Sequence, residues 1–268
     1  MAASFFLTLR EGLEAALILG ILLGALRKID REDLGGPIWA GAGAAVASSL
    51  VVGLILNYIG ASLEGRAEEI FEGLAMILAA GFLTWTVLWM RSQSQAINQK
   101  LEADAQSAVL KDSKPALFTL AFLSVFREGV ELALFLTAAS MSTGNTNVLI
   151  GAAFGLAAVG VLAVLLFQSL IRLNIGRFFQ ITSILLILFA AGLVAHGVHE
   201  FNEAGVIPSI TVHVWDINSI LDENSTIGEL LKVLVGYNGN PSLSEVIAYT
   251  GYLSILLFLT RKKPVRIV

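Results

Sequence analysis

The sequence predicts an all-α integral membrane protein with about seven transmembrane helices. Of its 268 residues, 56% are hydrophobic and 14% are charged, and the mean hydropathy is +0.79, whereas a soluble domain has about 25% charged residues. The apolar residues fall in blocks of about 18 or more, which is long enough for a helix to cross a hydrocarbon core of about 30 Å. We therefore expect a single membrane domain (1–268) surrounded by lipid.

Charged and turn-forming residues divide the chain into seven predicted spans. The last span is expected to begin with a capping box formed by Ser242 and Glu245. Prolines at 37, 115 and 241 lie beside three of the predicted starts, where proline is tolerated. The predicted spans are 4–27, 37–59, 68–91, 116–140, 147–172, 177–201 and 243–261.

Two longer segments connect these spans. Residues 92–115 are polar and are predicted to be a partly helical cytoplasmic linker. Residues 202–242 are predicted to be an extracytoplasmic loop, in which Thr226 and Glu229 cap a short helix that ends at Val235.

The basic residues lie mostly on one side of the predicted spans. The side that carries the more basic loops is the cytoplasmic one, so the N-terminus is predicted outside and the C-terminus inside. Arg66 and Lys232 are the two basic residues on the outer side. The thirteen on the inner side are Arg27, Lys28, Arg31, Arg91, Lys100, Lys111, Lys114, Arg172, Arg177, Arg261, Lys262, Lys263 and Arg266.

A charged motif occurs twice, and its two copies indicate an inverted repeat. The first span contains Arg10-Glu11-Gly12-Leu13-Glu14, and the fourth contains Arg127-Glu128-Gly129-Val130-Glu131. With three spans in each copy, the second copy must insert upside down, an architecture that recurs in secondary transporters. The predicted parts are a first three-helix repeat (1–91), a second three-helix repeat (116–201), and a last helix with a basic cytoplasmic tail (243–268).

Small residues in the second and fifth spans also match between the two halves. Gly41 and Gly43 lie in one, and Gly151 and Gly155 lie in the other. Glycines at such spacings are typical of helices that pack closely in membranes, so we predict that they serve helix packing.

Each charged motif places one arginine and two glutamates on one side of an apolar helix. Glu11 and Glu14 are three residues apart, and Arg10 and Glu14 are four apart, so the three side chains fall within about 100° of arc. Since one arginine neutralises one glutamate, each motif retains a charge of about −1 inside the membrane, where uncompensated charge is costly. Gly12 and Gly129 are expected to let another backbone or an ion approach.

Two motifs facing each other would offer carboxylate oxygens to a cation. Such oxygens suit hard cations, and calcium, magnesium, manganese and ferric iron all qualify. The alternative is that each set of charges is a buried clamp between helices. A purely structural clamp has no use for the second glutamate of each motif, which favours the cation path.

A second acidic group is predicted at the outer ends of the third and sixth spans. Glu68 and Glu72 are four residues apart, a spacing at which like charges repel unless a cation or a buried partner compensates them. The alternative is a solvated helix end. The residues predicted to capture the ion there are Glu68, Glu69, Glu72, His199 and Glu200.

The paired motifs resemble the signature of the oxidase-dependent iron transporter family, the high-affinity iron permeases of fungi and bacteria. The resemblance covers nearly the whole chain and includes Glu68-Glu69-Ile70-Phe71-Glu72-Gly73, His199-Glu200 and Pro241-Ser242-Leu243-Ser244-Glu245-Val246-Ile247. It implies high-affinity iron uptake across the plasma membrane, which is the inner membrane in a bacterium. It also implies that Glu11, Glu14, Glu128 and Glu131 form the iron path, supported by Arg10 and Arg127.

The resemblance implies a permease with iron as substrate and no permanently bound cofactor. It also implies that any oxidase or iron-binding function outside the cell comes from a separate partner protein. The chain has no Cys, which excludes thiolate metal sites, no phosphate-binding loop for ATP, and no Lys/Arg run that would indicate nucleic-acid binding. The alternatives are a transporter of another hard divalent cation, a membrane di-iron oxidase, and an anchor for an oxidase. Di-iron enzymes of this type use Glu-x-x-His, whereas both motifs here are Glu-x-x-Glu.

Overall fold

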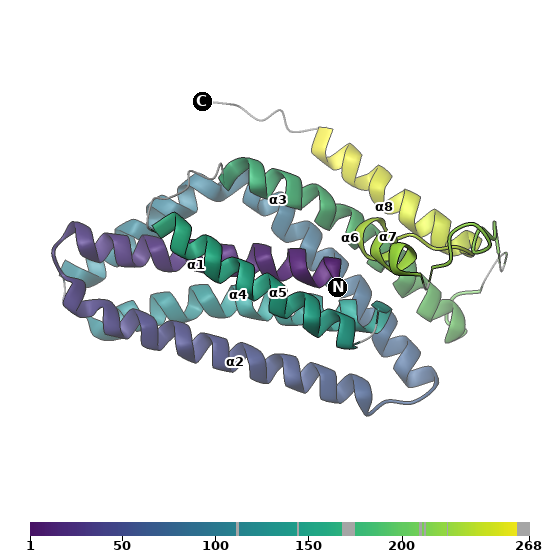
Figure 1. Cartoon of the computed structure of the whole chain (residues 1–268), viewed down its shortest axis with the longest axis horizontal. Helices are drawn as coiled ribbons and strands as arrows, with labels where there is room; N and C mark the ends of the chain where they lie inside the picture. The colour runs from purple at the N-terminus through teal and green to yellow at the C-terminus, as the bar shows by residue number, and fades with distance from the viewer. Residues whose placement is uncertain are drawn as a thin grey trace.

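The computed structural model describes residues 1–110, 113–143, 145–167, 175–208, 211, 213–223 and 225–261. Within these residues all regular structure is helical (Figure 1). The elements are α1 (Ala2–Lys28), the short 3-10 helix η1 (Glu32–Leu34), α2 (Gly35–Ala61), α3 (Arg66–Leu110), α4 (Lys114–Thr143), α5 (Asn145–Phe167), α6 (Ile175–Glu203), α7 (Thr226–Val235) and α8 (Leu243–Arg261).

The described chain contains five helical stretches that are long and apolar enough to cross a membrane. The two other long helices, α1 and α4, carry the charged motifs, each with three charged residues inside its apolar stretch. The prediction of a multi-span, all-α membrane protein is therefore confirmed. The five stretches are Glu32–Gly60, Arg66–Leu88, Thr146–Leu165, Gln180–Glu203 and Leu243–Thr260.

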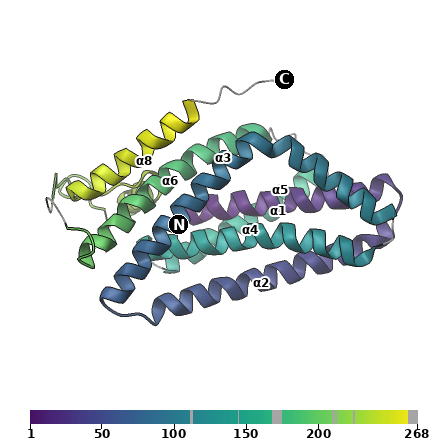
Figure 2. The same cartoon turned by 180° about the vertical axis from the view of Figure 1, so that it is seen from behind.

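The third helix is much longer than the predicted third span. It continues from Arg66 to Leu110, so most of the segment predicted as a linker extends this helix. Near its end, Ala108 is buried against Leu26, Leu34 and Leu117. Figure 2 shows α3 bending so that its last turns run back along the ends of α1 and α4. This contact closes one end of the bundle.

The two halves of the chain are interleaved. The helices α1 and α4 lie side by side and run in opposite directions (Figures 1 and 2). The helix α5 packs on α1, α2 packs on α4, and α3 packs on α6. If α1, α2 and α3 are exchanged with α4, α5 and α6, the α1–α5 pair becomes the α4–α2 pair, and the α3–α6 pair is unchanged. This arrangement is the one that an inverted repeat requires.

Glycines make the closest of these contacts possible. A methyl group on Gly155 would lie 2.8 Å from Cβ of Thr8, and one on Gly41 would overlap the carbonyl oxygen of Phe118. Gly151 likewise lies against the start of α1. These three glycines therefore serve helix packing as predicted. Gly43 is exposed and has no such neighbour.

The motifs lie between apolar layers. One layer is formed by residues of α1, α3, α4 and α6 that include Leu7, Met76 and Phe135. On the other side, Phe122 and Phe126 of α4 pack around Ala42, Ala45 and Val125. The rings of these two phenylalanines are stacked, with centroids 5.3 Å apart. The charged residues are thus enclosed along the bundle axis.

The capping box of the last helix is confirmed. The Glu245 backbone N–H donates to Ser242 Oγ at 3.3 Å, and the Ser242 N–H donates to Glu245 Oε1 at 3.2 Å. The short helix α7 ends at Val235 as predicted, but its N-cap is Ser225 and not Thr226. Ser225 Oγ accepts from the Gly228 N–H at 3.0 Å.

The remaining predicted boundaries agree with the helices to within a few residues. Pro37 and Pro115 lie in the first turns of α2 and α4, where no intrahelical donor is needed. Some predictions fall outside the described residues. They are the end of the fifth span (168–172), Lys111, Arg172 and the basic tail from Lys262.

Candidate functional site

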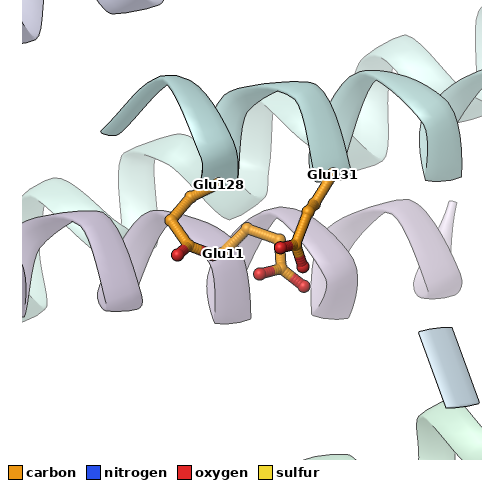
Figure 3. A group of neighbouring side chains, drawn as sticks. All are labelled: Glu11, Glu128 and Glu131. Carbon is orange, nitrogen blue, oxygen red and sulfur yellow. The ribbon is translucent and has the colours of Figure 1, made fainter. Parts of the chain in front are cut away.

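The facing surfaces of α1 and α4 bring three glutamates together. One carboxylate oxygen from each of Glu11, Glu128 and Glu131 lies within 4.8 Å of the others. All three are buried, with relative exposures of 1%, 4% and 1%. Figure 3 shows Glu11 on α1 reaching across to Glu131 on α4, with Glu128 one turn away. The two motifs, 117 residues apart in sequence, thus form a single group.

Arg10 bridges the two glutamates of its own motif. Its Nη1 lies 2.5 Å from Glu11 Oε1, and its Nη2 lies 3.1 Å from Glu14 Oε1. The Arg10 side chain is 1% exposed. Planar guanidinium presents its donors in a fixed geometry that suits two carboxylates at once, so Arg10 fixes the positions of both.

Arg127 holds its motif differently. Its Nε lies 2.8 Å from Glu131 Oε1 and 3.9 Å from Glu128 Oε1. The Arg127 side chain is 36% exposed, whereas that of Arg10 is buried. The two copies of the motif therefore have the same sequence pattern but unequal surroundings.

Glu14 is the fourth predicted site residue, and it lies beside the group of three. It is 8% exposed and is paired with Arg10. It is also within electrostatic range of Glu131. The structure therefore assembles all four glutamates in one region, with three of them closest together.

Two oxygens of this group are buried without a hydrogen-bond partner among the described residues. They are Glu11 Oε2 and Glu128 Oε2. A buried polar atom left unsatisfied costs about 1–3 kcal/mol, and more when the group is charged. A cation placed among the carboxylates would offset this cost. The donor set is oxygen only, which suits a hard metal ion.

The motif glycines accommodate helices and not an ion. A methyl group on Gly12 would lie 2.6 Å from Cγ2 of Val159 on α5, and one on Gly129 would overlap Ser49 Oγ on α2. Of the two roles that the sequence left open for these glycines, the structure gives the approach of a neighbouring helix. Each motif helix is thereby seated against a helix of the other half.

A residue that the sequence did not indicate also contacts the group. Thr86 on α3 is fully buried, and its hydroxyl donates to Glu131 Oε2 at 3.3 Å. In the sequence it is one of two threonines in the third span. Its contact with Glu131 can be recognised only once the structure places α3 next to α4.

The predicted outer residues lie at the adjoining ends of α3 and α6. Gly73 contacts Phe201 and the carbonyl oxygen of Gly197, which brings the start of α3 beside the end of α6. Glu69, Glu72 and Glu200 are partly buried there, and Glu200 interacts electrostatically with both Glu72 and Glu69. Glu68 is exposed and interacts in the same way with Glu72.

His199 pairs with two other glutamates and also interacts electrostatically with Glu200. Its Nδ1 lies 3.0 Å from Glu245 Oε1, and its Nε2 lies 3.4 Å from Glu203 Oε1. The buried Glu245 carboxylate also accepts from Asn238 Nδ2 at 2.6 Å. In this arrangement both ring nitrogens of His199 are engaged, and the residue joins α6 to the start of α8.

Comparisons with known proteins agree with this architecture. The chain matches the model of the iron permease FTR1 family over residues 1–262. It is 36% identical over 255 residues to the ferrous iron permease EfeU of Escherichia coli O6:K15:H31, covering 94% of this chain and 92% of that protein. It is 31% identical over 261 residues to the ferrous iron permease EfeU of Yersinia pestis, covering 97% and 93%. No solved structure matches the chain. By this match and these identities, the chain belongs to the iron permease FTR1 family.

Proposed function

We propose that this iron permease takes up iron across the plasma membrane, and that the ion passes through the carboxylate site between α1 and α4. The observation that carries this path is the convergence of Glu11, Glu128 and Glu131 from the two halves, in a position enclosed by apolar layers. Substrate sites of inverted-repeat transporters lie near the midplane, at the interface of the repeats. In a prokaryote the membrane is the inner membrane.

The charge of the site favours a divalent ion. Four glutamates and two arginines leave a net charge of −2 when all are ionised. A dication neutralises this charge, and a buried charge without compensation is costly in a membrane. We therefore propose ferrous iron as the transported species, in line with the names of the relatives.

We further propose that Glu68, Glu69, Glu72 and Glu200 collect the ion at the outer surface. Negative charge gathered at an opening raises the local concentration of cations and speeds their capture. His199 remains a predicted member of this outer group: its Nδ1 can stay on Glu245, as is usual for a metal-binding histidine, while its Nε2 would have to leave Glu203 in order to bind an ion. The ion would then pass inward between α1, α3 and α4.

The proposed direction of transport is inward, with the N-terminus outside and the C-terminus in the cytoplasm. The resemblance also implies a separate oxidase or iron-binding protein on the outer side. Addition of such an oxidase to the assay below, with ascorbate left out, should then change the uptake rate, and an unchanged rate would remove this partner from the proposal.

The test is uptake of radioactive iron into proteoliposomes, with ascorbate keeping the iron ferrous, in the presence and absence of a pH gradient. Glu11→Gln, Glu128→Gln and Glu131→Gln should each abolish uptake, because each removes a charged oxygen ligand. Glu32→Gln is the matched control, since Glu32 is an exposed member of a surface ion pair. Near-normal uptake by the three site variants at normal membrane abundance would exclude this path.

A further inference from the structure

Thr86 differs from the other described side chains of α3 in being polar and fully buried. Its neighbours on the same helix, Leu83 and Val87, belong to the apolar layer beside the site. A buried hydroxyl is costly unless it is hydrogen-bonded, and valine has nearly the same shape. The hydroxyl at this position therefore calls for a specific explanation.

The hydroxyl of Thr86 is also bonded in an unusual way. Threonine and serine within membrane helices commonly donate to the carbonyl oxygen four residues earlier. Thr84 does so to Ala80 at 2.6 Å, and Thr137 does so to Ala133 at 2.8 Å. Thr86 instead donates across the helix interface to Glu131 Oε2. This bond joins α3 to the carboxylate site.

Both oxygens of Glu131 are therefore held by donors. Arg127 Nε lies 2.8 Å from Oε1, and Thr86 Oγ1 lies 3.3 Å from Oε2. A carboxylate has about four lone-pair positions, so two donors fix its plane and still leave acceptor positions for a cation. Donors that orient a metal-binding carboxylate in this way commonly tune the affinity of the site.

We propose that Thr86 is a positioning residue, whose hydroxyl fixes the Glu131 carboxylate in the orientation that binds the transported cation. The proposal rests on the function proposed above for Glu131. It adds a third helix to a site that the sequence assigned to two. Because the hydroxyl is neutral, it orients the carboxylate without reducing the negative charge that attracts the ion.

The test compares Thr86→Val, Thr86→Ser and Thr84→Val in the ferrous iron uptake assay. Thr86→Val should raise the half-saturating iron concentration by about 10- to 100-fold, the usual effect of removing such a donor. Thr86→Ser retains the hydroxyl and should restore most of the affinity. Thr84→Val is the matched control on the same helix, since the Thr84 hydroxyl contacts Tyr252 and not the site.

The outcomes separate this proposal from the one on which it rests. If Thr86→Val leaves the half-saturating concentration unchanged while Glu131→Gln abolishes uptake, the role of Thr86 is wrong and the path stands. If Thr86→Val and Thr86→Ser lower only the abundance of folded protein, Thr86 has a packing role. If Glu131→Gln transports normally, the path itself fails.

Discussion

The two arginines of the motifs are not equivalent. Arg10 is buried and contacts both glutamates of its motif through separate Nη atoms, whereas Arg127 is partly exposed and contacts Glu131 through Nε. A lysine ammonium is a compact charge that cannot reproduce the planar arrangement of two donors. The cost of such a replacement should therefore depend on the position.

We expect Arg10→Lys to impair iron uptake more than Arg127→Lys. Disrupting a buried ion pair costs about 3–5 kcal/mol, and the exposed side of Arg127 leaves more room for an ammonium with its water. The measurement is uptake per folded transporter for the two variants. Arg27→Lys is the control, because Arg27 forms an exposed pair with Glu32. Equal losses at positions 10 and 127 would contradict this asymmetry.

At the scale of single residues, the sequence predicted the charged members of the site but not their neighbours. Arg-Glu-x-x-Glu is visible because charge is rare within apolar blocks. Thr86 is not, because a hydroxyl in a membrane helix can satisfy itself on its own backbone. The sequence placed His199 with the outer carboxylates because of its position at a helix end. Its actual partner, Glu245, follows it by 46 residues.

At the scale of helices, local signals gave most boundaries. Charged flanks and the capping box located the spans, and both depend on residues near each helix end. The segment after residue 91 was predicted to be partly helical, which is confirmed, but its continuity with α3 up to Leu110 was not predicted because its polar residues resemble a linker. The packing of Ala108 against Leu26, Leu34 and Leu117 holds this extension in place. The N-cap of α7 was misplaced by one residue because Ser225 and Thr226 are both capping residues.

The adjoining ends of α3 and α6 carry the next prediction. Glu72→Gln and Glu200→Gln should each raise the half-saturating iron concentration several-fold while leaving the maximal rate nearly unchanged, because they weaken capture and not passage. The effect should be larger at low ionic strength, where exposed charges are less screened. Uptake kinetics at two salt concentrations provide the measurement.

Glu64→Gln is the control for this experiment, because Glu64 is exposed on the loop that precedes α3. Complete loss of transport at saturating iron in the Glu72 or Glu200 variant would move these residues into the crossing path. Unchanged kinetics in both would leave the cluster as a solvated helix end.

At the scale of the whole molecule, the sequence predicted the inverted repeat but not how closely its halves are interleaved. Duplicated motifs reveal that two units exist. The pairing of helices between the two units depends on close contacts at glycines. Examples are Gly12 with Val159 and Gly129 with Ser49. Those contacts join residues more than 75 positions apart in the sequence, beyond the reach of local patterns.

The orientation of the molecule in the membrane gives the last prediction. Ser62 precedes α3 and Ser107 lies near its end, and both are exposed in the structure. Because the chain has no Cys, single Ser62→Cys and Ser107→Cys variants report on the two ends of α3, which are predicted to lie on opposite sides of the membrane. An impermeant thiol reagent applied to intact cells should label the first and not the second. The reverse labelling pattern would invert the topology and with it the proposed side of iron capture.

The ion pairs within α1 also bear on how the protein is made. The fourth span, with its copy of the motif, follows the first by 117 residues, which at about 5–20 residues per second corresponds to roughly 6–23 s of synthesis. During that interval the first helix has neither α4 nor α5 beside it. Arg10, Glu11 and Glu14 lie in one helix and pair with one another, so this helix can enter the lipid with most of its charge already compensated. These three residues thus act as one another's counter-charge while the ribosome completes the second half.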